Sequence, residues 1–103
     1  MAKEELDIKS LEVKTELDCG AVVIKLYEVP IGLAFNRNIT GENKQGEVIW
    51  QVEDVWPSSC ALFMNIKPFD NERIIAYNWA GMDYYIDIQT GTLDPVNKNA
   101  RPW

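Results

Sequence analysis

Histidine is absent from this chain of 103 residues. It is the commonest general base in enzymes and a component of the Ser-His-Asp and Cys-His arrangements. Only two cysteines are present, and an ordinary zinc site needs about four nitrogen or sulfur ligands. We therefore predict a protein that is not an enzyme and holds neither a transition metal nor a cofactor.

Long hydrophobic runs are also missing. The longest aliphatic run is Ala21-Val22-Val23-Ile24, far short of the roughly 20 residues that span a bilayer. No apolar segment follows the charged start of the chain, so a secretory signal is not expected. These absences predict a cytoplasmic protein without a membrane segment.

Positive charge is scarce, with 10 basic against 16 acidic residues and a formal net charge of −6. A chain without a basic patch is poorly suited to phosphates or to an anionic membrane surface. The sequence therefore argues against nucleic-acid and membrane binding. The charge fits a basic protein partner, and plain solubility explains it equally well.

The residues that are present favour β-structure. Hydrophobic content is 47% and charged content 25%, as in globular proteins, and the length allows one domain spanning residues 1–103. Apolar residues alternate with polar ones at period 2 almost everywhere, which is typical of half-buried strands. We predict strands over 11–17, 21–29, 32–40, 47–53, 61–67, 73–79 and 82–88, and a short edge strand from Leu93.

Between and beyond these strands the sequence is polar. Residues 41–46 are expected to form a loop, residues 1–7 a frayed turn of helix, and residues 94–103 a tail. The predicted fold is an all-β antiparallel meander of six to eight strands. It forms either one twisted sheet or a small sandwich or half-barrel.

Ala80-Gly81 joins two alternating runs, and glycine supplies the positive φ of a two-residue hairpin turn. This loop length predicts that Tyr77 lies opposite Tyr84 and that Trp79 lies opposite Met82. Their side of the hairpin would then face the core, together with Trp50 from residues 47–53.

A short stretch recurs along the chain. Gly32, an aromatic residue, Asn38 and Ile39 match the spacing of Gly81, an aromatic residue, Asp87 and Ile88, 49 residues later. An offset of this size is found in propeller blades. The chain thus has room for two blade-like units.

The motif Gly46-Glu-Val-Ile-Trp50, followed by Tyr77-Asn-Trp-Ala-Gly81 and Asp87-Ile-Gln-Thr-Gly91, resembles one blade of a PQQ-type or WD-like β-propeller. It is also similar to small uncharacterised bacterial proteins, some of which lie beside polymorphic-toxin genes. The resemblance covers about residues 32–93 and implies an immunity-type inhibitor. Two units cannot close a propeller, which needs about four blades, so the quinone cofactor is not implied.

Five residues are candidates for binding. Asp83 and Asp87 lie four apart on one strand and leave the same face, as paired carboxylates for sugar or calcium chemistry do, although a solvated sheet face has the same pattern. Asp87 is also expected to accept backbone N–H groups of the following turn. Tyr85 falls on the polar face, and Trp56 and Trp103 fall in a loop and the tail. Exposed aromatic residues of this kind are enriched at recognition sites.

The sequence thus favours a non-catalytic protein-interaction module, such as an inhibitor of a basic toxin. The alternative is a small-ligand or carbohydrate-binding protein that uses Trp56, Asp83 and Tyr85. Because an open meander leaves two unpaired strand edges, we also predict a homodimer formed by edge pairing or by packing of the face with Trp56 and Tyr85. A monomer whose edges are covered by the N-terminal segment or the Pro102-Trp103 tail is the alternative.

Overall fold

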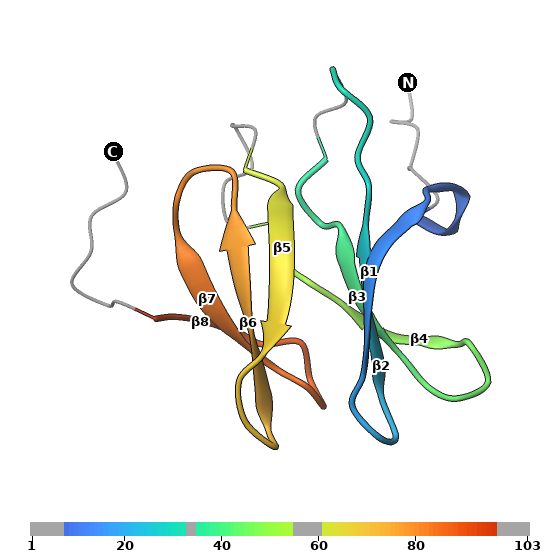
Figure 1. Cartoon of the computed structure of the whole chain (residues 1–103). Coiled ribbons are helices and arrows are strands. Elements are labelled where there is room, and N and C mark those ends of the chain that lie inside the picture. Colours follow the sequence, from blue (N-terminus) through green and yellow to red (C-terminus); the bar gives the residue numbers. More distant parts are fainter. Residues whose placement is uncertain (1–7, 33–34, 55–60, 97–103) are drawn as a thin grey trace.

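The computed structural model describes residues 8–32, 35–54 and 61–96, and Figure 1 shows the course of the chain. In this part, no helix is long and apolar enough to cross a membrane. The elements are a 3₁₀ turn and eight strands: η1 (Ile8–Ser10), β1 (Val13–Asp18), β2 (Val23–Tyr27), β3 (Ile39–Glu42), β4 (Val48–Gln51), β5 (Phe63–Pro68), β6 (Arg73–Asn78), β7 (Asp83–Asp87) and β8 (Leu93–Pro95).

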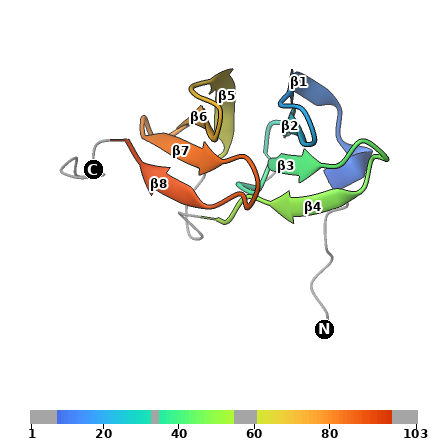
Figure 2. The same ribbon diagram turned by 90° about the horizontal axis from the view of Figure 1, so that it is seen from below.

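The strands form two four-stranded antiparallel sheets, in the orders β1-β2-β3-β4 and β5-β6-β7-β8. We call them the first and the second sheet. Strands adjacent in sequence are adjacent in each sheet, so each sheet is a meander, and β5 also contacts β1 and β2 of the first sheet. Figure 2 shows the two sheets side by side. The predicted all-β meander of up to eight strands is confirmed.

One core joins the sheets. Every second residue of β2, β6 and β7 points inward, which is the alternation that the pleat of a strand imposes. The buried cluster takes members from both sheets, so the arrangement is two packed sheets and not a single sheet. Its most deeply buried side chains include Ile24, Leu26, Ile39, Val52, Phe63, Ile74, Ala76 and Ile86.

The predicted register of the β6–β7 hairpin is wrong by one residue. Tyr77 pairs with Asp83, and Tyr84 pairs with Ala76. The loop has three residues, closed by bonds from Asn78 N to Met82 O (3.0 Å) and from Gly81 N to Asn78 O (3.1 Å), with Gly81 at φ 82°. This is the geometry of a type I turn followed by a left-handed residue. As a result Tyr77 is only half-buried and Trp79 is 65% exposed, whereas Tyr84 is in the core.

Two irregularities also changed the predicted faces. The alternation over residues 61–67 predicts that Leu62, Met64 and Ile66 share one face. The pairing of β5 with β6 shifts between Phe63 and Asn65, so Phe63 and Ile66 are buried, whereas Leu62 and Met64 are half-buried. The pairing of β3 with β4 shifts between Gly41 and Glu42, which leaves Val48 43% exposed. An extra residue in one strand reverses the face of everything beyond it.

The strand predicted over residues 32–40 begins only at Ile39, and Gly41 and Glu42, expected in a loop, belong to β3. The preceding Asn36 and Asn38 connect the sheets with their side chains. Asn36 Oδ1 accepts the N–H of Ala61 at 2.9 Å. Asn38 Oδ1 accepts the N–H of Phe63 at 2.9 Å, and its amide nitrogen donates to Phe63 O at 2.8 Å and to Tyr27 O at 3.1 Å. These amides take the place of a neighbouring strand at the start of β5.

Trp50 connects the sheets at a second point. Its indole Nε1 donates to Ile88 O at 2.8 Å, beyond the end of β7. A methyl group at Gly41 or at Gly91 would overlap the indole ring, so both positions require the absence of a side chain. Trp50 is therefore held between β3 and the β7–β8 turn, as its predicted burial requires.

The first two strands of each sheet recur at a fixed interval. β1 and β5 start 50 residues apart, as do β2 and β6, and both hairpins carry an irregularity at the same point, Val13/Thr15 and Phe63/Asn65. The 49-residue match made from the sequence does not align strand with strand, because Ile39 opens β3 whereas Ile88 follows β7.

Candidate functional site

A groove opens where the two sheets meet, at the end of the molecule that carries the β6–β7 hairpin loop. We call it the end groove. Its volume is about 300 Å³, within the range of small-ligand sites. The lining comes from β1, from the segment after β2, from the start of β5 and from Trp79, and it is mainly apolar.

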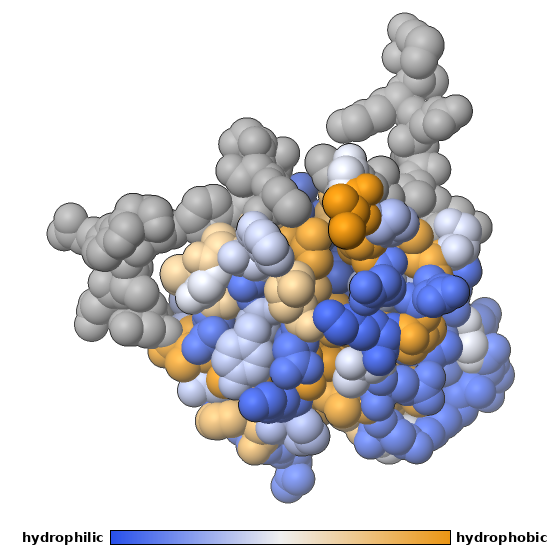
Figure 3. All heavy atoms as spheres, turned by 45° about the horizontal axis from the view of Figure 1, so that its top comes forward, coloured by the Kyte–Doolittle hydropathy of each residue, from blue (hydrophilic) through white to orange (hydrophobic). Residues whose placement is uncertain are grey.

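Two lining residues, Ile31 and Trp79, are the most exposed large hydrophobic side chains in the described part of the chain, at 106% and 65%. Gly32, at φ 90°, turns the backbone directly after Ile31. Trp79 opens the three-residue hairpin loop, and its N–H bonds to Leu62 O at 2.8 Å. Figure 3 shows this end of the molecule, where hydrophobic side chains reach the surface beside polar ones.

The charged groups of the end groove lie at Lys14 and Glu28. The Lys14 ammonium donates to Met64 O at 3.1 Å and lies 3.9 Å from the Glu28 carboxylate. Met64 sits in the irregular part of β5, where the ladder is interrupted. Lys14 thus connects the two sheets across the end groove. Among the described lining residues, it is the only one with an ammonium group.

Three predicted site residues, Asp83, Tyr85 and Asp87, lie together on the outer face of the second sheet. They alternate along β7 with the buried Tyr84 and Ile86, and all three are partly exposed. The structure therefore brings these three together, as the sequence predicted. Trp56 and Trp103 lie outside the described residues.

Tyr85 is already in contact with two neighbours. The centre of its ring lies 4.6 Å from that of Phe69, and the Arg73 guanidinium carbon lies 4.5 Å from it. Arg73 also pairs with Asp70 at 3.0 Å, and this bond raises the pKa of Arg73. Hydrogen bonds from the Glu72 N–H and from Arg73 hold the pKa of Asp70 below its usual range. The stack is a cation placed over aromatic rings on an open sheet.

Asp87 has the local role that the sequence predicted. Its Oδ1 accepts the N–H groups of Gln89 at 2.9 Å and Thr90 at 3.1 Å. These bonds organise the turn that places Gly91 against Trp50. Asp87 therefore stabilises the β7–β8 turn, and Asp83 is the carboxylate of the pair without such a bond in the described part of the structure.

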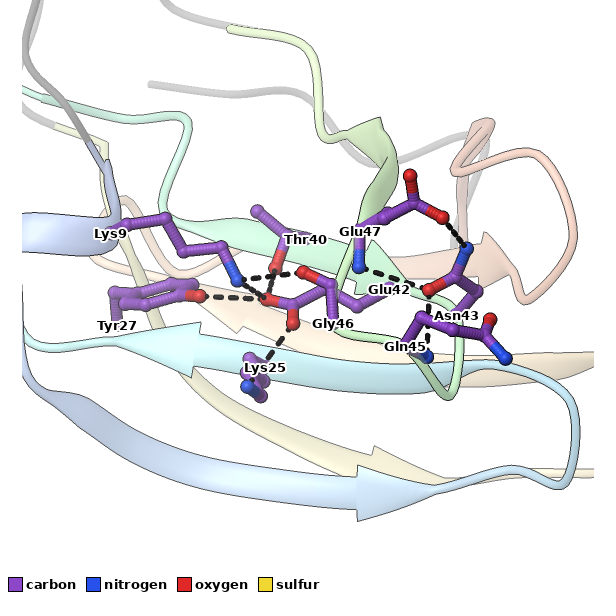
Figure 4. A network of polar contacts seen from close by, with 9 residues as sticks. All are labelled: Lys9, Lys25, Tyr27, Thr40, Glu42, Asn43, Gln45, Gly46 and Glu47. Carbon is purple, nitrogen blue, oxygen red and sulfur yellow. Dashed lines mark hydrogen bonds and ion pairs between the residues drawn. The ribbon is translucent and has the colours of Figure 1, made fainter.

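Sequence reasoning missed a buried carboxylate on the first sheet. The side chain of Glu42 is 1% exposed, and Oε2 accepts from Tyr27 Oη at 2.9 Å and Thr40 Oγ1 at 3.2 Å. Lys9 and Lys25 complete the site at 2.8 Å and 3.1 Å (Figure 4). The signal in the sequence was the alternation along residues 39–42. It places Thr40 and Glu42 on the sheet face opposite to that of Ile39 and Gly41.

Burial alone would raise the pKa of Glu42, but hydrogen bonds from Lys9, Tyr27 and Lys25 more than offset it, so this pKa lies below its ordinary value. Burial raises the pKa of Tyr27, which keeps its proton for the bond to Glu42. An ionised carboxylate enclosed by four donors has no room for a substrate. The arrangement holds η1 on the first sheet, since Lys9 also donates to Gly46 O at 3.3 Å.

Cys19 lies in a second, more polar groove at the opposite end of the seam between the sheets. Its side chain is half-buried. Burial, with a smaller effect of the Asp18 carboxylate, raises the pKa of its thiol. A protonated thiol is a poor nucleophile and metal ligand. Cys60 lies outside the described residues.

Comparison with known families gives a match over most of the chain. The model of a family described as a domain of unknown function, DUF7957, matches residues 3–98. No curated protein and no solved structure matches the chain. Since the match covers nearly the whole sequence, the chain belongs to the DUF7957 family.

Proposed function

We propose that this chain is a non-catalytic protein-interaction module whose partner inserts an apolar side chain into the end groove. The observation that carries the proposal is the exposure of Ile31 and Trp79 beside a mainly apolar groove. Burying one large apolar side chain contributes about 1.5–3 kcal/mol. Tryptophan is also among the residues that dominate binding energy at interfaces.

The net charge of −6 supports a basic partner. Opposite charge speeds the encounter of two proteins and selects against acidic competitors. A basic toxin, the partner implied by the resemblance to immunity proteins, meets this requirement. That identity stays a prediction.

Carbohydrate binding by Asp83 and Tyr85 is less well supported. A sugar ring stacks on an open aromatic face, whereas Phe69 and Arg73 already lie against the ring of Tyr85. Catalysis is also less well supported. The most enclosed titratable group described, Glu42, is covered by Lys9, Lys25 and Tyr27.

The test compares two isoleucine variants of the full chain. Ile31→Asp places a charge at the end groove, and Ile49→Asp places the same charge on β4, where Ile49 is 47% exposed. We expect the wild type and Ile49→Asp to capture a host protein that Ile31→Asp does not capture. Calorimetric titration of that protein should give an affinity at least about tenfold weaker for Ile31→Asp. Equal binding by both variants would show that the groove is not the contact.

A further inference from the structure

Four strands lie at the edges of the two sheets, β1 and β4 in the first sheet and β5 and β8 in the second. The backbone N–H and C=O groups on the outer side of an edge strand can pair with a strand of another chain unless something blocks them. In Figure 2, β1 and β5 lie along the same side of the molecule. Both strands also contribute lining residues to the end groove, so their edges are the ones next to a partner bound there.

The edge of β5 is closed by side chains of the chain itself. The amide of Asn38 bonds both the N–H and the C=O of Phe63. Farther along β5, Asn65 Oδ1 accepts the N–H of Ile66 at 3.0 Å, and Pro68 has no N–H to offer. A strand of another chain therefore finds few backbone groups to pair with on β5.

The edge of β1 is open and longer than those of β4 and β8. β1 has six residues, whereas β4 has four and an interrupted ladder, and β8 has three and ends in Pro95. Residues of an antiparallel strand direct their backbone groups alternately toward and away from the neighbouring strand. Because Cys19 N bonds Val22 O at the turn after β1, the backbone groups of Glu16 and Asp18 point away from β2. Among the described residues, no other backbone group bonds them.

This open edge carries negative charge. Glu16 and Glu12, which directly precedes β1 by one residue, are both exposed, and Lys14 between them bonds the second sheet across the end groove. Lys25 pairs with Glu16 across the two strands, but its ammonium lies 3.1 Å from the carboxylate of Glu42. The carboxylates of Glu12 and Glu16 therefore attract a basic strand, and they repel the same edge of a second copy.

We propose that the partner adds an extended basic segment to the edge of β1 as a further strand. This inference rests on the proposed function, because it takes the end groove as the contact and adds backbone pairing beside it. Lys14 belongs both to β1 and to the lining of the groove, so a segment on this edge can place an apolar side chain in the groove. In strand addition, main-chain hydrogen bonds give the affinity and side-chain pockets give the selectivity. The segment that fits has alternating basic and apolar residues.

The probe is a blocked heptapeptide in which lysine alternates with leucine. Its control is the same peptide with methylated backbone nitrogens, which keeps the charges and side chains but cannot donate hydrogen bonds to a strand edge. Binding of each labelled peptide to the full chain is measured by fluorescence anisotropy at low ionic strength. We expect the unmodified peptide to bind at least about tenfold more tightly than the methylated one. We also expect the amide of Glu16 to exchange its hydrogen more slowly in the complex, because a strand then covers it.

Glu16→Lys tests the charge of the edge, and Glu53→Lys is its matched control. Glu53 is an exposed residue after β4, and its reversal changes the net charge by the same amount. We expect Glu16→Lys to weaken binding of the unmodified peptide at least about fivefold, and Glu53→Lys less than about twofold. Absence of peptide binding, equal affinities for the two peptides, or equal effects of the two variants would overturn the inference. The proposed function would survive that result if Ile31→Asp still failed to capture the host protein, since that variant tests the end groove alone.

Discussion

The outer faces of the two sheets differ in what covers them. On the first sheet, Lys9 of η1 pairs with Glu42, whose side chain is 1% exposed. On the second sheet, Arg73, Tyr85 and Asp83 remain accessible to solvent. The two sheets have the same strand order, but the carboxylate of Glu42 on the first sheet is buried and paired, whereas that of Asp83 on the second sheet is partly exposed. Substitution of matched residues in the two sheets tests this difference.

The largest loss of stability is expected for a substitution at Asn38, which joins the two sheets. Asn38→Ala removes an amide that bonds both backbone groups of Phe63 and the carbonyl of Tyr27. Buried polar groups left unpaired cost about 1–3 kcal/mol each, so we expect a loss of about 3–4 kcal/mol in the free energy of unfolding. Urea denaturation measures it. Asn71→Ala, at an exposed position between β5 and β6, should cost less than about 0.5 kcal/mol.

A smaller loss is expected at the contact of Trp50 with the β7–β8 turn. Gly91→Ala adds a methyl group that overlaps the indole, at a residue with φ 76°, and should cost about 3 kcal/mol. Gly46→Ala is the control, because its φ is 84° and no atom lies within 4 Å of the added methyl group. It should cost about 1 kcal/mol. Equal losses in thermal denaturation would show that Trp50 does not hold the turn.

Glu42→Gln is expected to cost about 2 kcal/mol, since it leaves Lys9 and Lys25 without their carboxylate while both can still reach water. The corresponding change on the second sheet, Asp83→Asn, should lie within about 0.5 kcal/mol of the wild type. Chemical denaturation of the two variants at neutral pH compares the faces directly. A costly Asp83→Asn would mean that the second face is structural as well.

The smallest expected effect is on the way the free energy of unfolding changes with pH. Folding lowers the pKa of Glu42 from its ordinary value of 4.5. The ionised carboxylate therefore contributes fully to the free energy of unfolding above pH 4.5, and this contribution is lost as the pH falls through the lower pKa of the folded state. Wild-type stability should therefore fall more steeply than that of Glu42→Gln as the medium is acidified below about pH 4.5. Parallel curves from denaturation at a series of pH values would contradict a role for the ionised carboxylate.

The sequence predicted the number and order of strands well, because alternation and turn glycines are local signals. It could not fix the register of the β6–β7 hairpin, since both registers place apolar side chains opposite one another: Tyr77 with Tyr84 in the predicted register, and Ile74 with Ile86 in the observed one. Loop length decided the register, and Gly81 fits a loop of two or three residues. The role of Glu42 depends on Lys9, which is distant in sequence and packs on it only after folding.

None of the five predicted binding residues is among the described lining residues of the end groove. Alternation along β7 correctly grouped Asp83, Tyr85 and Asp87 on one face. It could not reveal the end groove, which takes residues from both sheets. The resemblance to a propeller blade and to immunity proteins stays a prediction.

The amides of Asn36 and Asn38 have a consequence for how the chain folds. They occupy the backbone groups of Ala61 and Phe63, so the second sheet is complete only when the segment before β3 is in place. The two halves, despite their common strand order, are not separate folding units. Unfolding should be a single cooperative transition, and a fragment that begins after residue 54 would expose an unsatisfied strand edge able to recruit other chains into aggregates.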